Sequence, residues 1–479
     1  MATITLSPSL SEDALVNSIN TAMLNNATLE LLPGYHLTKR GVRQKIKVGA
    51  NGLHIKGTLA PTTPVFSSIK RPNGAIEIHQ TDDNYGLFFI PDDPTPTELA
   101  QITTWYTHTD PTDPFQYAVL VRGDIVIEGV ELDCNMGNQG ILLEQSAGEH
   151  SAMLGFAGAM TKYTSGALAG KRVYTAFKNV KMDNIRTIRG GFADDIWISR
   201  SYARPNIETV SITNIKSGPR INNKRATIQV SGLVQNMIVK NARIYRLECE
   251  DTVAGEGMWS ERPGPPLPLD NKMYSFWTLS DIICDVLDLA VKGKAIKLTA
   301  DNIKTRKAVL LSQTGGSFKD CTFRVEETNR RFFRMNDMLF ERVTWLLTAN
   351  DAGHVGGLRP TSQYGDICKA TFKDNKFLCD SSDADIVSGQ LIDSEYSVIV
   401  PPIPPIPPPI PNNVNVRFEG CFYDPRFGSA AFPQTNIAYA DERGKWFFKH
   451  IDFAGISDTR AVRRFIQPAQ HPGVDVQIT

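Results

Sequence analysis

Short strands joined by a polar turn recur along the chain from Val126 to Tyr423. Each unit has an apolar-x-apolar stretch, then an Asn, Asp, Glu or Gly, then a second short strand, as in VIEGVEL, SITNIKS, IVKNARI, SFKDCTF and RFEGCFY. Such alternation sends one set of side chains into a core and the other towards solvent. The pattern therefore predicts an all-β chain.

The polar turn residues give these units their period. Between Asp281 and Glu341 they lie 20, 19 and 21 residues apart, and longer gaps elsewhere indicate inserted loops. Asn and Asp suit a sharp turn, because they tolerate left-handed backbone conformations and form local hydrogen bonds. The predicted turn residues are Gly129, Asn179, Asn214, Asn241, Asp281, Asp301, Asp320, Glu341, Asp374 and Glu419.

A repeat of this length predicts a solenoid, in which neighbouring coils stack and share one core. Leucine-rich repeats need regular Leu spacing and a helix in each unit, and the sequence shows neither. Propeller blades need units of roughly 40 residues or more. The architecture that fits is a parallel β-helix.

The N-terminal segment EDALVNSINTAMLNNATLELLPGYHLTKRGVRQKIKVGANGLHIKGT supports this interpretation. It holds a predicted short helix over 13–24, a turn at Pro33-Gly34-Tyr35 and a later strand that ends at Gly57. Together with the repeat, it resembles the right-handed parallel β-helix proteins of the pectin-lyase-like superfamily, most of all phage tailspikes and pectate-lyase-like proteins. The resemblance covers roughly residues 10–455. It implies that the helix caps the open end of the solenoid, where strand edges would otherwise be unpaired.

Composition divides the chain into four parts. They are a cap with the first coils (1–60), an irregular insertion rich in Pro, Thr and Asp (61–118), the parallel β-helix (119–455) and a C-terminal cap or tail (456–479).

Three loops are expected to interrupt the β-helix, at 136–172, 250–272 and 400–413. The first is rich in Gly and Ala and is expected to be partly helical. The third contains VPPIPPIPPPIPNN, whose prolines fix φ and remove backbone donors, so we predict a polyproline II segment. This segment is a stiff loop that spans two coils, a contact with a neighbouring subunit, or a docking site for an aromatic groove.

Charge and cysteine content narrow the functional classes. The chain has 51 Lys and Arg and 51 Asp and Glu, so its net charge is zero and nothing favours nucleic acid as a partner. No apolar run approaches the roughly 20 residues of a membrane-spanning helix, and we expect no membrane insertion. The N-terminus shows no secretory signal peptide. Seven scattered cysteines without a C-x-x-C pair indicate buried thiols, made in a reducing compartment.

The stretch GGFADDIWISRSY, residues 190–202, holds the first candidate site. Strand alternation points its two central isoleucines to the core, so Asp195 and Trp197 are expected to point outward. Asp194 then lies in the preceding turn or in a buried position. An outward Trp beside a carboxylate suits a sugar, because a pyranose packs on the ring and its hydroxyls bond to the carboxylate.

The paired aspartates are similar to those of the polygalacturonase family. That family also carries a Gly-His-Gly motif and an Arg-x-Lys motif. This chain offers only AGHVGG around His354, and GPRINNKR with Arg220 and Lys224 at a different spacing. The similarity therefore does not assign polygalacturonase activity.

A second candidate set lies in RIYRLECEDT, where Glu248 and Glu250 are expected to point outward. Glu256 and Trp259 follow on the adjoining loop. A glycoside hydrolase needs two carboxyl groups about 5–5.5 Å apart for retention, or roughly 6.5–9.5 Å apart for inversion. A pairing across neighbouring coils would supply them. The candidate catalytic residues are Asp195, Asp194, Glu248 and Glu250.

A lyase would instead need a base and a cation that neutralises a substrate carboxylate. SGPRINNKRA offers Arg220, Lys224 and Arg225 for this purpose, although a solvated basic loop is the preferred interpretation of these residues. No spacing matches a calcium loop, and we predict no cofactor and no metal. The candidate substrate-binding residues are Trp197, Arg200, Tyr202, Arg220, Lys224 and Trp259.

The resemblance to tailspikes implies a homotrimer of the virion tail, made in the host cytoplasm and in contact with other tail proteins. Such a protein binds a host surface polysaccharide and in some cases cleaves it. Two alternatives stay open. One is a free bacterial polysaccharide lyase or glycoside hydrolase, cytoplasmic or secreted without a signal peptide. The other is a structural or adhesin β-helix that binds without cleaving.

Overall fold

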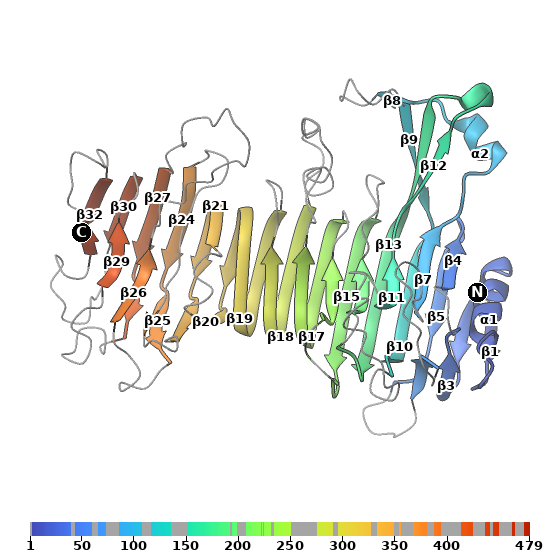
Figure 1. The fold of residues 1–479 in the computed structure, drawn as a ribbon, viewed down its shortest axis with the longest axis horizontal. Coiled ribbons are helices and arrows are strands. Elements are labelled where there is room, and N and C mark those ends of the chain that lie inside the picture. Colours follow the sequence, from blue (N-terminus) through green and yellow to red (C-terminus); the bar gives the residue numbers. More distant parts are fainter. Residues whose placement is uncertain are drawn as a thin grey trace. The chain divides into compact units, whose positions relative to one another are not determined.

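The computed structural model (Figure 1) divides into two compact units, Met1–Thr278 and Leu279–Thr479. The described residues are 2–39, 44–59, 66–72, 86–107, 116–135, 152–191, 194–198, 207–221, 223, 225–230, 234–250, 275–290, 296–326, 333–348, 354–355, 367–380, 388–393, 413–424, 436–440, 444–449, 462–464 and 474–479.

Both units consist of β-strands that pair almost entirely in parallel, so the prediction of an all-β chain is confirmed. The described residues include two α-helices, neither long and apolar enough to span a membrane. The first unit contains α1 (Ala14–Leu24), α2 (Pro96–Gln101), the 3-10 turn η2 (Gly166–Leu168), β1 (Ala2–Leu6), β2 (Ala27–Leu31), β3 (Gly34–Leu37), β4 (Gln44–Val48), β5 (Leu53–Lys56), β6 (Ser67–Lys70), β7 (Leu87–Pro91), β8 (Tyr106–Thr107), β9 (Gln116–Arg122), β10 (Ile125–Asp133), β11 (Ala152–Phe156), β12 (Ala159–Tyr163), β13 (Lys171–Ile188), β14 (Asp194–Ile198), β15 (Ile207–Ser217), β16 (Ile228–Val230) and β17 (Val234–Glu250).

Strand β18 (Ser275–Ala290) contains the division between the units. The second unit then has β19 (Ile296–Lys319), β20 (Thr322–Glu326), β21 (Phe333–Glu341), β22 (Thr344–Thr348), β23 (His354–Val355), β24 (Ile367–Lys373), β25 (Lys376–Cys379), β26 (Ser388–Asp393), β27 (Asn413–Glu419), β28 (Phe422–Tyr423), β29 (Asn436–Ala440), β30 (Gly444–Lys449), β31 (Val462–Arg464) and β32 (Val474–Ile478).

The strands of the first unit form three runs of parallel neighbours. One run is β1, β2, β5, β10, β13, β15 and β17. A second joins β3 and β6 to the later halves of β10, β13, β15 and β17. A third is β4, β7, β11, β14, β16 and the end of β17. Strands β10, β13 and β15 therefore belong to two runs each, and β17 belongs to all three.

Strands β10, β13, β15 and β17 of the first unit each contain one residue in the left-handed backbone region. In the first unit these are Gly129, Asn184, Asn214 and Asn241, with φ between 50° and 66°. In the second unit Asn302 lies within β19, whereas the left-handed residues Asp320, Arg342, Asp374 and Gly420 lie between consecutive strands. Asn179, Asp301, Glu341 and Glu419 are not left-handed, so those four predicted turn positions are wrong: three by one residue and Asn179 by five. In three of these four cases the residue that adopts the left-handed conformation is Asn or Gly, which tolerate it best; Arg342 is the exception.

Buried apolar side chains stack from strand to strand at fixed register. In the first unit one such row is Leu29, Ile55, Ile127, Met182, Ile212 and Val239, each at most 1% exposed. In the second unit the row is aromatic: Phe318, Phe340, Phe372 and Phe418 stack with centroid distances of 5.4, 5.0 and 4.8 Å. These distances lie in the favourable range for ring pairs. The six cysteines with described side chains are buried and free, as the sequence predicts.

Helix α1 begins at Ala14, one residue later than predicted, and packs on the strands β1 to β5 of the first unit. Its buried residues Leu15, Ile19 and Ala22 repeat at helical spacing on one face.

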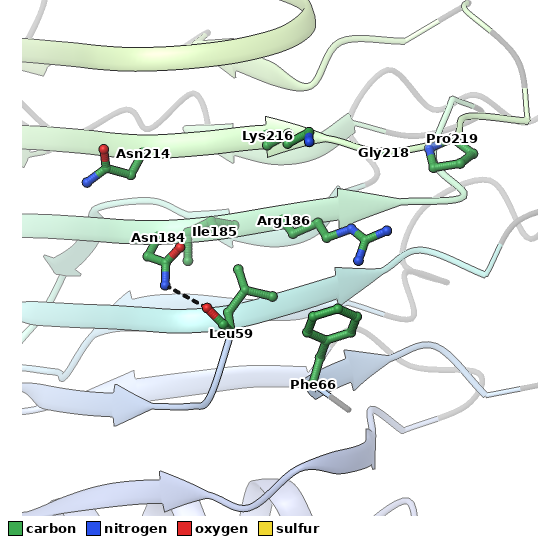
Figure 2. Close-up of a pocket in the computed structure, with 9 residues that line it drawn as sticks. All are labelled: Leu59, Phe66, Asn184, Ile185, Arg186, Asn214, Lys216, Gly218 and Pro219. Carbon is green, nitrogen blue, oxygen red and sulfur yellow. Dashed lines mark hydrogen bonds between the residues drawn. The ribbon is translucent and has the colours of Figure 1, made fainter. Parts of the chain in front are cut away.

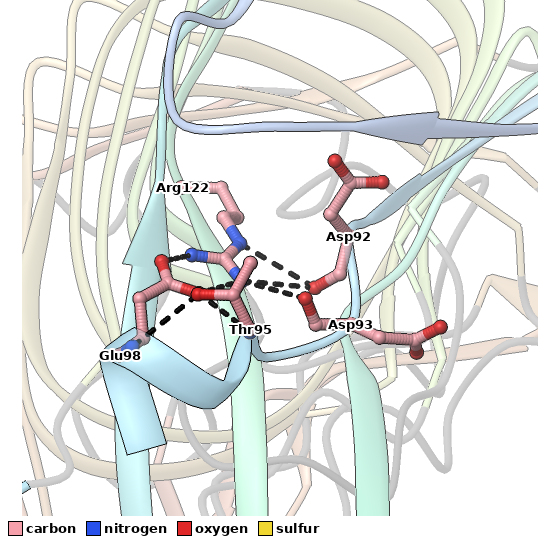
Figure 3. A network of polar contacts seen from close by, with 5 residues as sticks. All are labelled: Asp92, Asp93, Thr95, Glu98 and Arg122. Atoms are coloured by element: carbon pink, nitrogen blue, oxygen red, sulfur yellow. Dashed lines mark hydrogen bonds and ion pairs between the residues drawn. The ribbon is translucent and has the colours of Figure 1, made fainter. Parts of the chain in front are cut away.

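A side lobe departs from the parallel pattern. We define it as α2, β8, β9, β12 and the first five residues of β13, which lie together in Figure 1. Here β8 pairs with β9, and β12 with β13, in antiparallel fashion. Figure 3 shows how α2 is held: the buried guanidinium of Arg122 forms an ion pair with Glu98 and donates to the carbonyl oxygens of Asp92 and Asp93. Thr95 and Glu98 cap the helix reciprocally.

Several segments that the sequence marks as insertions supply strands. Residues 61–118 contain β6, β7, β8 and the start of β9, and the described residues of 136–172 contain β11, β12, the 3-10 turn η2 and the start of β13. Strands β7 and β11 are buried on both faces, so they lack the alternation that reveals a strand. Within 456–479, β32 pairs with β30. Residues 251–272 and 400–412, including the proline run, lie outside the described residues.

Candidate functional site

A groove of about 480 Å³ lies on the outer surface of the first unit (Figure 2). Strands β13 and β15 form its floor, and the segments around Leu59 and Phe66 form one side. The lining residues are Leu59, Phe66, Asn184, Ile185, Arg186, Asn214, Lys216, Gly218 and Pro219.

The floor of the groove follows from strand register. Asn184-Ile185-Arg186 on β13 lies beside Asn214-Ile215-Lys216 on β15, and Asn241-Ala242-Arg243 on β17 continues the pattern. In each triplet the first residue turns the strand and the second is buried. The third therefore points out of the sheet, and Lys216 and Arg243 are exposed.

One aromatic ring and two amides complete the groove. The guanidinium of Arg186 lies 5.0 Å from the centre of the Phe66 ring, a cation–π distance. Arg186 also lies 3.4 Å from the carboxylate of Glu131, whose pKa is raised mainly because burial disfavours its charged form. Asn184 donates to the carbonyl oxygen of Leu59 at 3.2 Å, as Figure 2 shows.

The asparagine amides are linked into a ladder along the turn. Asn241 donates to the side-chain oxygen of Asn214 at 2.6 Å, and Asn214 donates to the carboxylate of Asp183 at 2.7 Å. The amide groups are thereby fixed in orientation before any ligand binds.

The wall at Gly218 and Pro219 is fastened to the preceding coil by backbone hydrogen bonds. The backbone amide of Gly218 donates to the carbonyl oxygen of Thr187, and the backbone amide of Arg189 donates to the carbonyl oxygen of Pro219, each at 2.7 Å. Further on, the amide of Ile221 donates to the carbonyl of Gly190 at 2.9 Å. These backbone hydrogen bonds fix the position of the wall relative to the preceding coil.

Asp194 and Asp195 lie beneath this wall and do not reach solvent. Their exposures are 1% and 0%, so the expected outward position of Asp195 is wrong. Asp195 forms an ion pair of 2.7 Å with Arg220, and Asp194 accepts a hydrogen bond of 2.9 Å from the amide of Ala226. Burial raises the pKa of both carboxyl groups, and Arg220 opposes this shift at Asp195. The two aspartates therefore hold Arg220 and Ala226 from the buried side.

Trp197 is also buried, at 3% exposure, and the expectation of an outward sugar platform is wrong. Its ring packs 5.8 Å from that of Phe88, in an apolar cluster with Ala152 and Ala157. Gly155 lies between the two rings, and an added Cβ there would come within 2.3 Å of Phe88. The alternation rule fails because every residue of β14 is buried.

The remaining candidate catalytic and substrate-binding residues either form contacts within the protein or lie outside the described residues. Glu248 is largely buried and accepts a hydrogen bond of 2.8 Å from Arg246. The guanidinium of Arg220 donates hydrogen bonds to the carboxylate of Asp195, the hydroxyl of Thr227 and the carbonyl oxygen of Arg225. The expected substrate-binding residues Arg200, Tyr202, Lys224 and Trp259 and the side chain of Glu250 lie outside the described residues. No group of three His, Cys, Asp or Glu side chains in the described part could hold a metal ion.

Sequence reasoning missed the groove, although its signal is present. The motif Asn, apolar, basic occurs at 184–186, 214–216 and 241–243. A left-handed Asn followed by an inward residue places the basic one outward, and repetition on stacked coils aligns the three. Phe66 could not be found this way, because it follows no repeat.

No protein-family model, no curated protein and no solved structure matches the chain.

Proposed function

We propose that the chain is a right-handed parallel β-helix of the pectin-lyase-like, tailspike type, which binds a host surface polysaccharide in the groove on its first unit. Three runs of parallel strands and one left-handed turn in each long strand support this fold. Helix α1, with its apolar face on the first strands, is the proposed N-terminal cap.

The observation that carries the function is the groove itself. It combines the ring of Phe66, the fixed amides of Asn184 and Asn214, and the cations Arg186 and Lys216. Sugar rings pack on aromatic faces, and sugar hydroxyls and acidic groups bond to amides and cations. The groove crosses successive strands, so a chain ligand can contact several coils at once.

Binding without cleavage has the stronger support, because the described candidate carboxylates Asp194 and Asp195 are buried and Glu248 is paired. Cleavage by groups outside the described residues, as in a polysaccharide lyase or hydrolase, is the second candidate. The proposed homotrimer, its place in a virion tail and its contacts with other tail proteins rest on the tailspike resemblance.

Two experiments test the proposal. The intact protein is incubated with purified bacterial surface polysaccharides, while binding, new reducing ends and unsaturated uronate absorbance are measured. We expect binding to at least one polysaccharide and its loss in Phe66→Ala; binding that Phe66→Ala leaves unchanged would count against the groove. Light scattering should give about three times the chain mass of 53.0 kDa, and a monomer would contradict the tailspike assembly.

A further inference from the structure

The third residues of the Asn, apolar, basic motifs at 184–186, 214–216 and 241–243 form a row across three neighbouring strands. Arg186 on β13 is in register with Lys216 on β15, and Lys216 with Arg243 on β17. We call Arg186, Lys216 and Arg243 the cation row. Neighbouring strands lie about 4.8 Å apart, so the row presents one positive group at each such step.

This row is poorly neutralised by the protein. In the described part of the chain, no ion pair joins Lys216 or Arg243 to a carboxylate, and Arg186 reaches only the buried Glu131 at 3.4 Å. Like charges on neighbouring strands repel each other, so the row is unfavourable for the free protein. Such an arrangement is relieved when an anionic ligand binds along it.

On the other side of the same turns, in contrast, acidic and basic side chains balance each other's charge. There the in-register residues are Glu30, Lys56, Glu128, Asp183, Thr213 and Lys240. Lys56 lies 3.9 Å from Glu128, and Thr213 donates to Asp183. The net charge of the chain is zero, so the cation row is a local feature rather than a consequence of a basic chain.

We propose that the groove, together with Arg243 on the adjacent strand β17, selects a linear polyanionic glycan, bound across the strands with successive carboxylate or sulfate groups on Arg186, Lys216 and Arg243. This inference rests on the proposed function and names the class of polysaccharide. Guanidinium groups match the two oxygens of a carboxylate or sulfate, and the ammonium of Lys216 binds either as a point charge. The Phe66 ring beside Arg186 would receive the sugar ring at that end of the row.

The test measures binding of the full chain to immobilised alginate, dextran sulfate and neutral dextran. We compare the wild type with Lys216→Ala/Arg243→Ala and with Lys240→Ala, an exposed lysine of β17 on the balanced side of the turn. The proposal expects binding to alginate or dextran sulfate but not to dextran. It expects at least a tenfold weaker affinity in the double variant, at most a twofold change in Lys240→Ala, and weaker binding as salt increases.

Other outcomes overturn the proposal in distinguishable ways. Binding to dextran that Phe66→Ala abolishes and the double variant leaves intact would reject the polyanion and keep the proposed function. An equal loss in Lys240→Ala and the double variant would show nonspecific attraction and reject the cation row. Absence of binding to these three glycans and to every surface polysaccharide would reject both.

Discussion

The guanidinium of Arg220 lies 2.7 Å from the carboxylate of Asp195, and both side chains are buried beneath the wall of the groove. Arg220 also donates to Thr227 and to the carbonyl oxygen of Arg225, so one ion pair fixes a segment that leads away from Gly218 and Pro219. Asp195 is thus a structural residue of the groove.

Replacing Asp195 by Asn should destabilise the first unit strongly. It leaves the buried charge of Arg220 uncompensated, a change that costs about 3–5 kcal/mol in comparable pairs. Thermal unfolding followed by circular dichroism measures the effect. Asp195→Asn/Arg220→Met removes both charges and should recover part of the loss. Unfolding of Asp195→Asn at the wild-type temperature would show that the pair contributes nothing.

Replacing Gly190 by Ala should destabilise the same place for a steric reason. A Cβ at Gly190 would lie 2.1 Å from a carboxylate oxygen of Asp195, so the pair must shift, at a cost of about 1–3 kcal/mol. In an Asp195→Ala background that oxygen is absent, and the penalty of Gly190→Ala should shrink. Equal penalties in the two backgrounds, measured by thermal unfolding, would refute this contact.

The sequence predicted the strand repeat because the exposed and buried positions alternate around a turn of restricted conformation. It placed Gly129, Asn214, Asn241, Asp281, Asp320 and Asp374 correctly in the left-handed region. It could not reveal that β14 has a second covered face, because Phe88, which covers Trp197, comes from a strand far away in sequence. Asp195 and Trp197 were therefore expected outside, and the true groove residues had to be found from register between strands.

Asn241 tests the role of the left-handed turns. Its φ is 50°, and its amide bonds to Asn214 at 2.6 Å. Asn241→Ala should lose stability, whereas Asn241→Gly should lose less, because a left-handed residue with a Cβ costs roughly 1–2 kcal/mol. Urea unfolding of both variants measures the difference. A glycine variant that is no more stable than the alanine variant would contradict a conformational origin.

Acid should loosen the side lobe through Glu98. The ion pair with Arg122 lowers the pKa of Glu98 from its ordinary value of 4.5 to about 2. A lowered pKa means that the ionised form stabilises the fold, so this contribution is complete above pH 4.5 and is lost as the pH falls towards 2. Pepsin cleavage within 92–107 should accelerate over that interval.

Glu98→Gln provides the control for this acid effect, because glutamine keeps the shape and cannot titrate. The variant should be cleaved faster than the wild type at pH 4.5, with a much flatter dependence below it. An identical pH dependence in the two proteins would assign the acid sensitivity to other groups.

The central claim is that a polysaccharide binds in the groove over β13 and β15 and extends to Arg243 on the neighbouring strand β17. A crystal structure of the protein with an oligosaccharide from a polysaccharide that it binds tests this claim most directly. The account predicts sugar density over Phe66 and Asn214, with acidic groups within hydrogen-bonding distance of Arg186, Lys216 or Arg243. Sugar density elsewhere on the chain, with the groove empty, would contradict it.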